Sequence, residues 1–185
     1  MKILFGFLNI KYYSHVFILI SCTVSFLAWY VYPQFMNYGI SRNYVYLGWY
    51  LTFLLQIIFY QFLHWNLLHL LFNSYFLYQI WPEVESRMKR DEFMVFFLMN
   101  TLFVALSLLA LAPNSVTVGI SWFAMALLSY LFIDLYSVRH SMAWQLGFWL
   151  FLNVLTGFFG NISLVWHVSG AVFWILWWYL KKRIF

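Results

Sequence analysis

The chain has 185 residues, of which 65% are hydrophobic and only 8% are charged, with a formal net charge of +5. A soluble domain of this size cannot cover its surface with so few charged side chains. The composition therefore excludes a soluble protein and predicts an all-α polytopic membrane protein with a single domain, residues 1–185.

Six apolar runs follow one another along the chain, and a bilayer span needs about 20 apolar residues. We expect spans at roughly residues 15–33, 66–82, 93–111, 121–136, 143–157 and 162–180. A further stretch, residues 44–63, is also apolar, but Gly48, Gln56 and Gln61 interrupt it. Cys22, the only cysteine, has no partner for an internal disulfide, and we interpret it as a small apolar residue within the first span.

The positions of the basic residues separate two topologies. If residues 44–63 do not cross, both termini lie inside, together with nine of the ten Lys and Arg residues. These are Lys2, Lys11, Arg87, Lys89, Arg90, Arg139, Lys181, Lys182 and Arg183. Only Arg42 then lies outside, which is the positive-inside pattern. We prefer six spans to seven, and we interpret the basic residues as topology signals at the anionic cytoplasmic leaflet rather than as a nucleic-acid site.

Polar side chains from three spans are expected at one depth near the outer face. Ser121 lies at the outer start of the fourth span, and His167 lies about five residues into the sixth. The second span also begins outside and carries His69 and Asn73 at i and i+4, on one helix face. Ionisable groups in lipid are rare and usually functional. A serine hydroxyl that an imidazole can activate suggests hydrolysis of a peptide bond within the membrane.

Each of these residues also has a simpler interpretation when it is taken alone. A serine that begins a helix is most often an N-cap, so Ser121 fits that role. A single histidine in an apolar span, such as His167, is more often a packed and hydrogen-bonded residue than a catalyst. Asn73 alone fits a polar contact between helices. The occurrence of all three at one depth favours the functional interpretation.

Other classes of intramembrane protease fit the sequence poorly. The chain contains no His-Glu-x-x-His zinc motif, and its only aspartates, Asp91 and Asp134, lie at helix ends rather than as a pair. A metal site built from His64, His69 and His167 is conceivable, but no carboxylate or cysteine joins these histidines. We therefore expect no metal and no cofactor.

Three motifs resemble those of the rhomboid intramembrane serine proteases. They are a second-helix signature, His64-Trp-Asn-Leu-Leu-His69-Leu-Leu-Phe-Asn73, followed by Glu85; a nucleophile motif, Gly119-Ile-Ser121; and a histidine motif, His167-Val-Ser-Gly170. The second-helix signature is the most specific of the three. The resemblance covers nearly the whole chain from Val16. It implies a six-transmembrane-helix rhomboid-like bundle in which residues 34–65 form a membrane-embedded first loop.

The resemblance also implies a serine-type endopeptidase with a catalytic dyad. Ser121 would be the nucleophile, and His167 would be the general base and then the general acid for the leaving amine. Asn73 and His69, with the backbone N–H of Ser121, would form the oxyanion hole. No aspartate is placed to orient His167, because Asp134 lies at the inner end of its helix.

Four further residues would have supporting roles: His64, Gly119, Gly170 and Glu85. His64 would tie the first loop to the helix that follows it. Glu85 lies near Arg87, about 18 Å from Asn73 along one helix, and would therefore be a structural residue at the inner face.

Two tryptophans depart from the family pattern. Trp122 stands where the nucleophile motif commonly has a second glycine, and Trp174 stands where a small residue usually follows Gly170 on one helix face. Small residues at these positions let two helices approach closely. The tryptophans have three possible consequences. The first alternative is a wider gap between Ser121 and His167, the second is that the tryptophans point into lipid, and the third is that they fill space for each other.

Two more positions differ from the family pattern. Met125 stands where a tyrosine often stacks on the histidine, and Gln56 stands where an arginine is common.

Two functions stay open, an active protease and a catalytically inactive relative that binds transmembrane helices. In both cases we expect single-span transmembrane proteins and the lipid bilayer as partners. The expected location is the bacterial inner membrane, with both termini cytoplasmic. The outer loop, residues 157–163, is either a mobile cap over the site or an ordinary turn.

Overall fold

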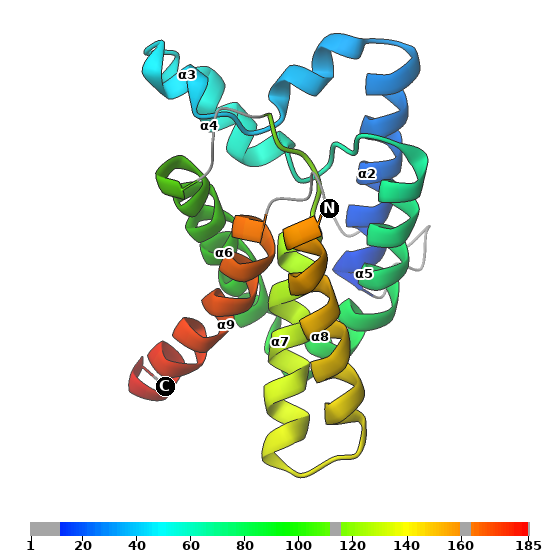
Figure 1. Cartoon of the computed structure of the whole chain (residues 1–185), viewed down its shortest axis with the longest axis vertical. Coiled ribbons are helices and arrows are strands. Elements are labelled where there is room, and N and C mark those ends of the chain that lie inside the picture. The colour runs from blue at the N-terminus through cyan, green and yellow to red at the C-terminus, as the bar shows by residue number, and fades with distance from the viewer. Residues whose placement is uncertain (1–11, 112–115, 160–163, 185) are drawn as a thin grey trace.

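A computed structural model describes residues 12–111, 116–159 and 164–184, and these residues form a bundle of helices (Figure 1). The long helices are α2 (Tyr13–Tyr30), α5 (Leu67–Arg87), α6 (Arg90–Leu111), α7 (Ser121–Ser137), α8 (Met142–Phe159) and α9 (Leu164–Ile184). The predicted cap at residues 157–163 lies largely outside the described residues, because α8 continues to Phe159 and the next four residues are not described.

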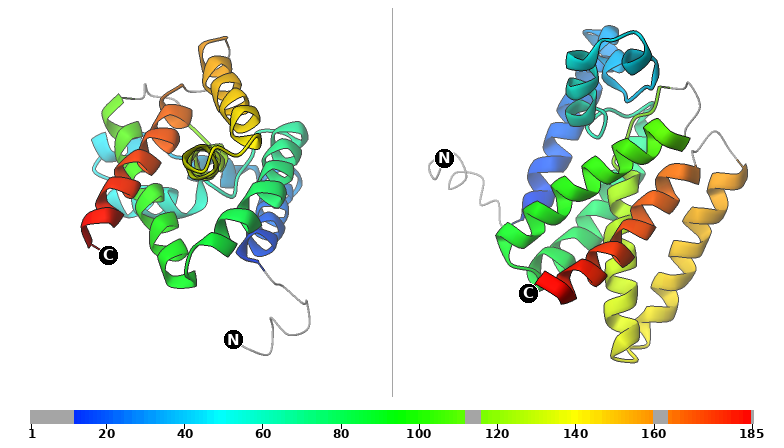
Figure 2. Two further views of the ribbon diagram at one scale, coloured as in Figure 1. Left: turned by 90° about the horizontal axis from the view of Figure 1, so that it is seen from below. Right: turned by 90° about the vertical axis from the view of Figure 1, so that its left-hand side faces the viewer.

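Helix α7 occupies the centre of the bundle. In Figure 2 it is seen end-on with the other helices around it, and it packs against α5, α6, α8 and α9. Its side chains from Trp122 to Leu131 are all buried. An α-helix that is apolar on every side is stable only when it is surrounded, so the sequence of α7 explains its central position.

Two helices within the described part of the chain, α2 and α6, are long and apolar enough to cross a membrane by composition alone. Helices α7, α8 and α9 also contain apolar stretches, over Ser121–Ser137, Met142–Leu155 and Leu164–Trp177. Helix α5 is less apolar because its last turns carry Glu83, Glu85 and Arg87. It continues through Pro82 to Arg87, five residues beyond the predicted end of the span.

The first loop contains three short helices, η1 (Pro33–Tyr38), α3 (Asn43–Tyr46) and α4 (Tyr50–Phe59), at one end of the bundle. A helix of ten residues such as α4 is about 15 Å long, which is half of the roughly 30 Å that a span must cover. The length of α4 is therefore consistent with the predicted embedded loop rather than with a seventh span. The buried Gln56 holds this loop together, because its side chain donates to Asn37 O at 2.9 Å and accepts from Ser41 N at 3.3 Å.

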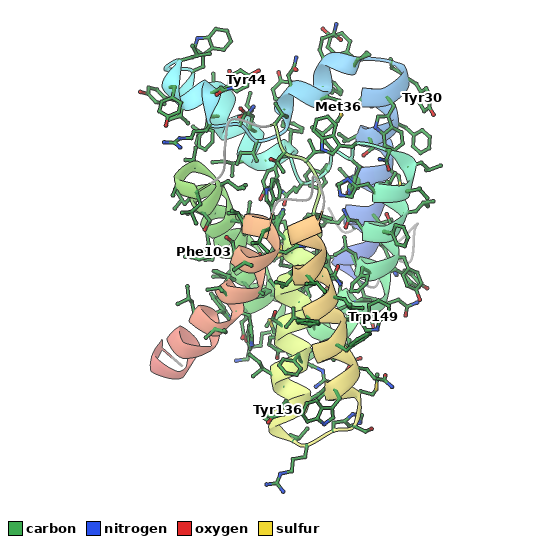
Figure 3. All side chains as sticks on the ribbon, in the orientation of Figure 1. Tyr30, Met36, Tyr44, Phe103, Tyr136 and Trp149 are labelled. Carbon is green, nitrogen blue, oxygen red and sulfur yellow. The ribbon has the colours of Figure 1, made fainter. Side chains whose placement is uncertain are left out.

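The opposite end of the bundle is held by polar contacts. The Glu85 carboxylate accepts a hydrogen bond from the backbone N–H of Tyr13 at 3.0 Å, which joins α5 to α2. Arg87 forms ion pairs with Glu83 on its own helix and with Asp134 on α7. In Figure 3, Tyr136 marks this end, and Tyr30, Met36 and Tyr44 mark the first-loop end.

Candidate active site

The segment that precedes α7 is held by the first loop. Ile40 and Thr117 pair through two backbone hydrogen bonds of 2.8 and 2.9 Å. Two residues later, Gly119 N donates to Tyr60 O at 2.8 Å. Gly119 has φ +113°, a conformation that side chains other than glycine rarely adopt. The first loop thus fixes the short segment that leads into Ser121.

Ser121 is the first residue of α7 and is only partly buried. The N-cap of α7 is Ile120, and no side-chain hydrogen bond caps the helix. The interpretation of Ser121 as an N-cap is therefore wrong. Its hydroxyl stands at the end of the bundle where the first loop packs, and it is not used to satisfy the backbone of its own helix.

His69 and Asn73 on α5 border this segment. A Cβ atom added to Gly119 would lie 2.8 Å from His69 Cε1 and 3.5 Å from Asn73 Nδ2. Asn73 is buried, and its Nδ2 has no hydrogen-bond partner among the described residues. Buried polar groups are almost always paired, so an amide donor beside the nucleophile segment is suited to bind an oxygen atom of a substrate.

His167 on α9 is buried, and its Nδ1 lies 2.8 Å from the backbone carbonyl oxygen of Asn153 on α8. A carbonyl oxygen can only accept, so Nδ1 carries the proton of the neutral ring and Nε2 keeps its lone pair. Sequence reasoning missed Asn153, because every residue has a carbonyl group and no side-chain signal marks this one.

The two helices that carry the predicted dyad are in backbone contact. A Cβ atom at Gly170 would lie only 2.0 Å from the carbonyl oxygen of Trp122. Gly170 follows His167 by three residues, and Trp122 follows Ser121 directly. This contact brings one end of α9 against the first turn of α7. Within the described chain, no hydrogen bond joins Ser121 to His167, and the ring nitrogen Nδ1 of His167 bonds to Asn153.

The two unusual tryptophans point into the protein. Trp122 is fully buried and stacks on Tyr60, with ring centroids 5.9 Å apart. Trp174 is 3% exposed and packs edge-on against Tyr130 at 4.2 Å. Of the three alternatives, the one in which the tryptophans point into lipid is wrong, because both are buried. They also do not separate α7 from α9, since Gly170 meets the backbone of Trp122. Each fills space against a different aromatic partner.

His64 lies where the first loop meets the bundle. Its Nδ1 is 3.2 Å from Ser25 Oγ on α2, and its carbonyl oxygen accepts from Trp29 Nε1 at 2.7 Å. Its ring packs edge-on against His69, with centroids 4.9 Å apart. His64 therefore contacts α2 and α5 at once.

Glu85 lies at the opposite end of α5, where it contacts the start of α2 and not the candidate site. Within the described ranges, no group of three or more His, Cys, Asp or Glu side chains is arranged to hold a metal ion.

Comparison with known families matches residues 52–183 to the Rhomboid domain, a region that runs from α4 to the last turn of α9. The chain therefore belongs to the rhomboid family of integral membrane proteins. The match confirms the predicted fold class, an all-α polytopic bundle. A search of curated proteins finds no significant match. The family includes intramembrane proteases and inactive relatives, so the site itself must support a choice between them.

Proposed function

We propose that this protein is an intramembrane serine endopeptidase that cleaves transmembrane proteins near the outer face of the membrane. The observation that carries the proposal is the convergence of three helices at one end of the bundle. Helix α7 contributes the Ser121 hydroxyl, α9 contributes the His167 imidazole, and α5 contributes the unpartnered amide of Asn73. Together they supply a nucleophile, a base and an oxyanion donor.

The proposed reaction begins when Ser121 Oγ attacks the substrate carbonyl carbon and His167 Nε2 takes the hydroxyl proton. The negative oxygen of the tetrahedral intermediate accepts hydrogen bonds from Asn73 Nδ2, from His69 and from the backbone N–H of Ser121. His167 then gives its proton to the leaving amine, and an ester to Ser121 remains. Water activated by His167 hydrolyses this ester and restores the free serine.

The backbone carbonyl of Asn153 takes the orienting role that an aspartate has in a triad. It holds Nδ1 of His167 at 2.8 Å and thereby directs Nε2 away from α8. A neutral carbonyl stabilises the imidazolium less than a carboxylate does, but it fixes the same tautomer. Because this contact orients the His167 ring, a dyad needs neither an aspartate nor a tyrosine stacked on the ring at the position of Met125.

Substrate entry is proposed to occur beside α8. This helix packs against α7 and α9, and Ala143 is its only buried residue between Met142 and Leu155. A helix with so little buried surface opens at low cost compared with the central helix α7. A substrate helix must also unwind locally, because its own hydrogen bonds occupy the carbonyl groups that Ser121 has to reach.

We also propose that the site faces the outside of the bacterial inner membrane and that both termini are cytoplasmic. The end of the bundle that carries Arg87, Arg90 and Arg139 would be the inner end. The first loop and the start of α7, which is Ser121, lie at the other end (Figure 1).

The proposed function is tested by reconstituting the parent chain in liposomes with a single-span reporter that has small residues near its outer end. The parent chain should release product, and the Ser121→Ala and His167→Ala variants should release none while keeping the parent's unfolding midpoint. The absence of a Ser121–His167 hydrogen bond favours the second candidate, an inactive relative that binds transmembrane helices. Reporter that co-purifies with a folded parent but is never cleaved would support that candidate.

A further inference from the structure

We propose that Tyr60 is a positioning residue that sets the spacing between Ser121 and His167. The inference deepens the proposed function and rests on it. Tyr60 follows α4 in the first loop and is fully buried. It is neither close in sequence to the dyad nor part of the predicted oxyanion hole, yet it contacts the segments on both sides of the site.

The backbone of Tyr60 acts on the nucleophile side. Its carbonyl oxygen accepts the 2.8 Å hydrogen bond from Gly119 N, two residues before Ser121. Gly119 is the residue that turns the chain into α7 with a positive φ. The position of Tyr60 therefore determines where α7 begins.

The ring of Tyr60 acts on both sides. It stacks on Trp122, the residue after Ser121, with centroids 5.9 Å apart and an interplanar angle of 24°. It also packs against Trp166, the residue before His167, at 5.5 Å and 64°. Tyr60, Trp122 and Trp166 are at most 3% exposed. We call these three residues the aromatic bridge.

In the aromatic bridge Trp122 has a structural role that the small residue common at its position cannot fill, because that role needs an aromatic ring. Aromatic rings are rigid and prefer defined offset or edge-on arrangements, and packed interiors transmit small displacements. The backbone contact of Gly170 with Trp122 sets how closely α9 approaches α7. The bridge adds a second link between the two helices, because the residue after Ser121 and the residue before His167 contact the same ring.

The test compares the parent with Tyr60→Leu, Tyr60→Phe and a matched control, Phe93→Leu. Phe93 is also fully buried in aromatic contacts at the start of α6, but none of its ring partners, Tyr13, Trp81, Phe96 and Phe123, belongs to the aromatic bridge. Four quantities are measured in liposomes: kcat, KM, the labelling rate of Ser121 by a fluorophosphonate, and the thermal unfolding midpoint.

Tyr60→Leu should lower kcat and the labelling rate about 10–100-fold with little change in KM, because a displacement of about 1 Å costs that much in a positioned site. Tyr60→Phe should keep the parent's kcat, because the ring is retained. Phe93→Leu should lower the unfolding midpoint about as much as Tyr60→Leu while keeping kcat. An unchanged kcat in Tyr60→Leu, or an equal loss in Phe93→Leu, would overturn the proposal.

A second readout separates this proposal from the proposed function. If the folded parent neither cleaves nor is labelled, the protease assignment fails, and the His167 ring then reports on the bridge directly. NMR of ¹³C-labelled histidine, with the His167 signal assigned by its loss in His167→Gln, should show a shifted signal in Tyr60→Leu and an unshifted one in Phe93→Leu. An unshifted signal in Tyr60→Leu would refute the positioning role even in an inactive protein.

Discussion

Two buried amides in this protein look alike by burial but lie in different surroundings. Asn73 is 8% exposed and borders the nucleophile segment, whereas Asn100 is fully buried within α6. In both, the Nδ2 atom has no hydrogen-bond partner among the described residues. Under the proposed mechanism only Asn73 donates to the oxyanion, because only Asn73 borders the segment that leads into Ser121.

Asn73→Ala should lower kcat by about 10²–10³-fold with KM little changed, the usual cost of losing one oxyanion donor. Asn100→Ala should keep the parent's kcat, and its stability should be equal or higher because an unpaired buried amide is removed. Reporter cleavage in liposomes and unfolding in detergent measure the two effects. Equal activity in Asn73→Ala and the parent would remove Asn73 from the oxyanion hole.

Gly119 combines a positive φ with a crowded position, whereas Gly48 also has a positive φ but lies in open space. A Cβ atom at Gly119 would lie 2.8 Å from the His69 ring, whereas no atom lies within 4 Å of one at Gly48. The left-handed conformation alone costs an alanine about 1–2 kcal/mol. We predict that Gly48→Ala loses about that much stability and keeps its activity.

Gly119→Ala should lose more stability than Gly48→Ala and should abolish cleavage, because His69 or the Ser121 segment must move. Parallel unfolding curves and cleavage assays measure the difference. If the two variants behave alike, the contact between Gly119 and His69 has no role in the site.

At the residue scale, side-chain type and spacing were enough to nominate Ser121, His167, His69 and Asn73 as candidates. The spacing of i and i+4 on one helix predicts that His69 and Asn73 share a face, and both border Gly119 in the structure. The orientation of His167 was not predictable. It depends on the backbone carbonyl of Asn153, and a backbone group carries no signal in the side-chain sequence.

At the scale of the helices, the contact between α7 and α9 is a backbone contact at Gly170. A methyl group there would lie 2.0 Å from Trp122 O, and neither backbone can move without shifting a whole helix. At a second helical glycine, Gly147 on α8, an added Cβ atom would lie 2.9 Å from the Phe132 ring. The Phe132 side chain can rotate aside, whereas the backbone of Trp122 cannot. Gly147→Ala is therefore a matched control for Gly170→Ala.

Gly170→Ala should lower the free energy of unfolding by more than about 2 kcal/mol, as overpacking in a tight interior does, and should reduce cleavage strongly. Gly147→Ala should be near neutral, since alanine favours a helix by about 1 kcal/mol over glycine. Unfolding in mixed micelles measures both. A stable and active Gly170→Ala variant would show that α7 and α9 need not approach closely.

The order of helices followed from apolar runs and prolines, because lipid allows few structures other than helices. The direction of Trp122 and Trp174 did not follow, since a tryptophan fits the lipid boundary and the interior equally well by composition. Each packs against a tyrosine that is distant in sequence, Tyr60 for Trp122 and Tyr130 for Trp174. Tertiary partners of this kind are not visible in a periodic pattern.

At the scale of the whole molecule, the six-span topology places the first loop and the hairpin between α7 and α8 on opposite faces. Asn43 and Arg139 are both exposed and mark these two places. A seven-span topology would place them on the same face. Single cysteines at the two positions, in a Cys22→Ser background, therefore distinguish the alternatives.

In intact spheroplasts, a membrane-impermeant maleimide should label Asn43→Cys and should label Arg139→Cys only after the membrane is permeabilised. Each cysteine variant must cleave the reporter as the parent does, or must match its unfolding midpoint. Labelling of both positions from the outside would contradict the six-span topology. Labelling of Arg139→Cys alone would show that the six-span bundle has the opposite orientation in the membrane.

The central claim is that Ser121 is a nucleophile activated by His167, and covalent labelling tests it without any assumption about the substrate. The purified parent is treated with a fluorophosphonate in liposomes, and the modified residue is located by mass spectrometry. We predict an adduct on Ser121 in the parent and none in His167→Ala of equal stability. A folded parent with no adduct on Ser121, or an adduct that forms equally without His167, would contradict the dyad.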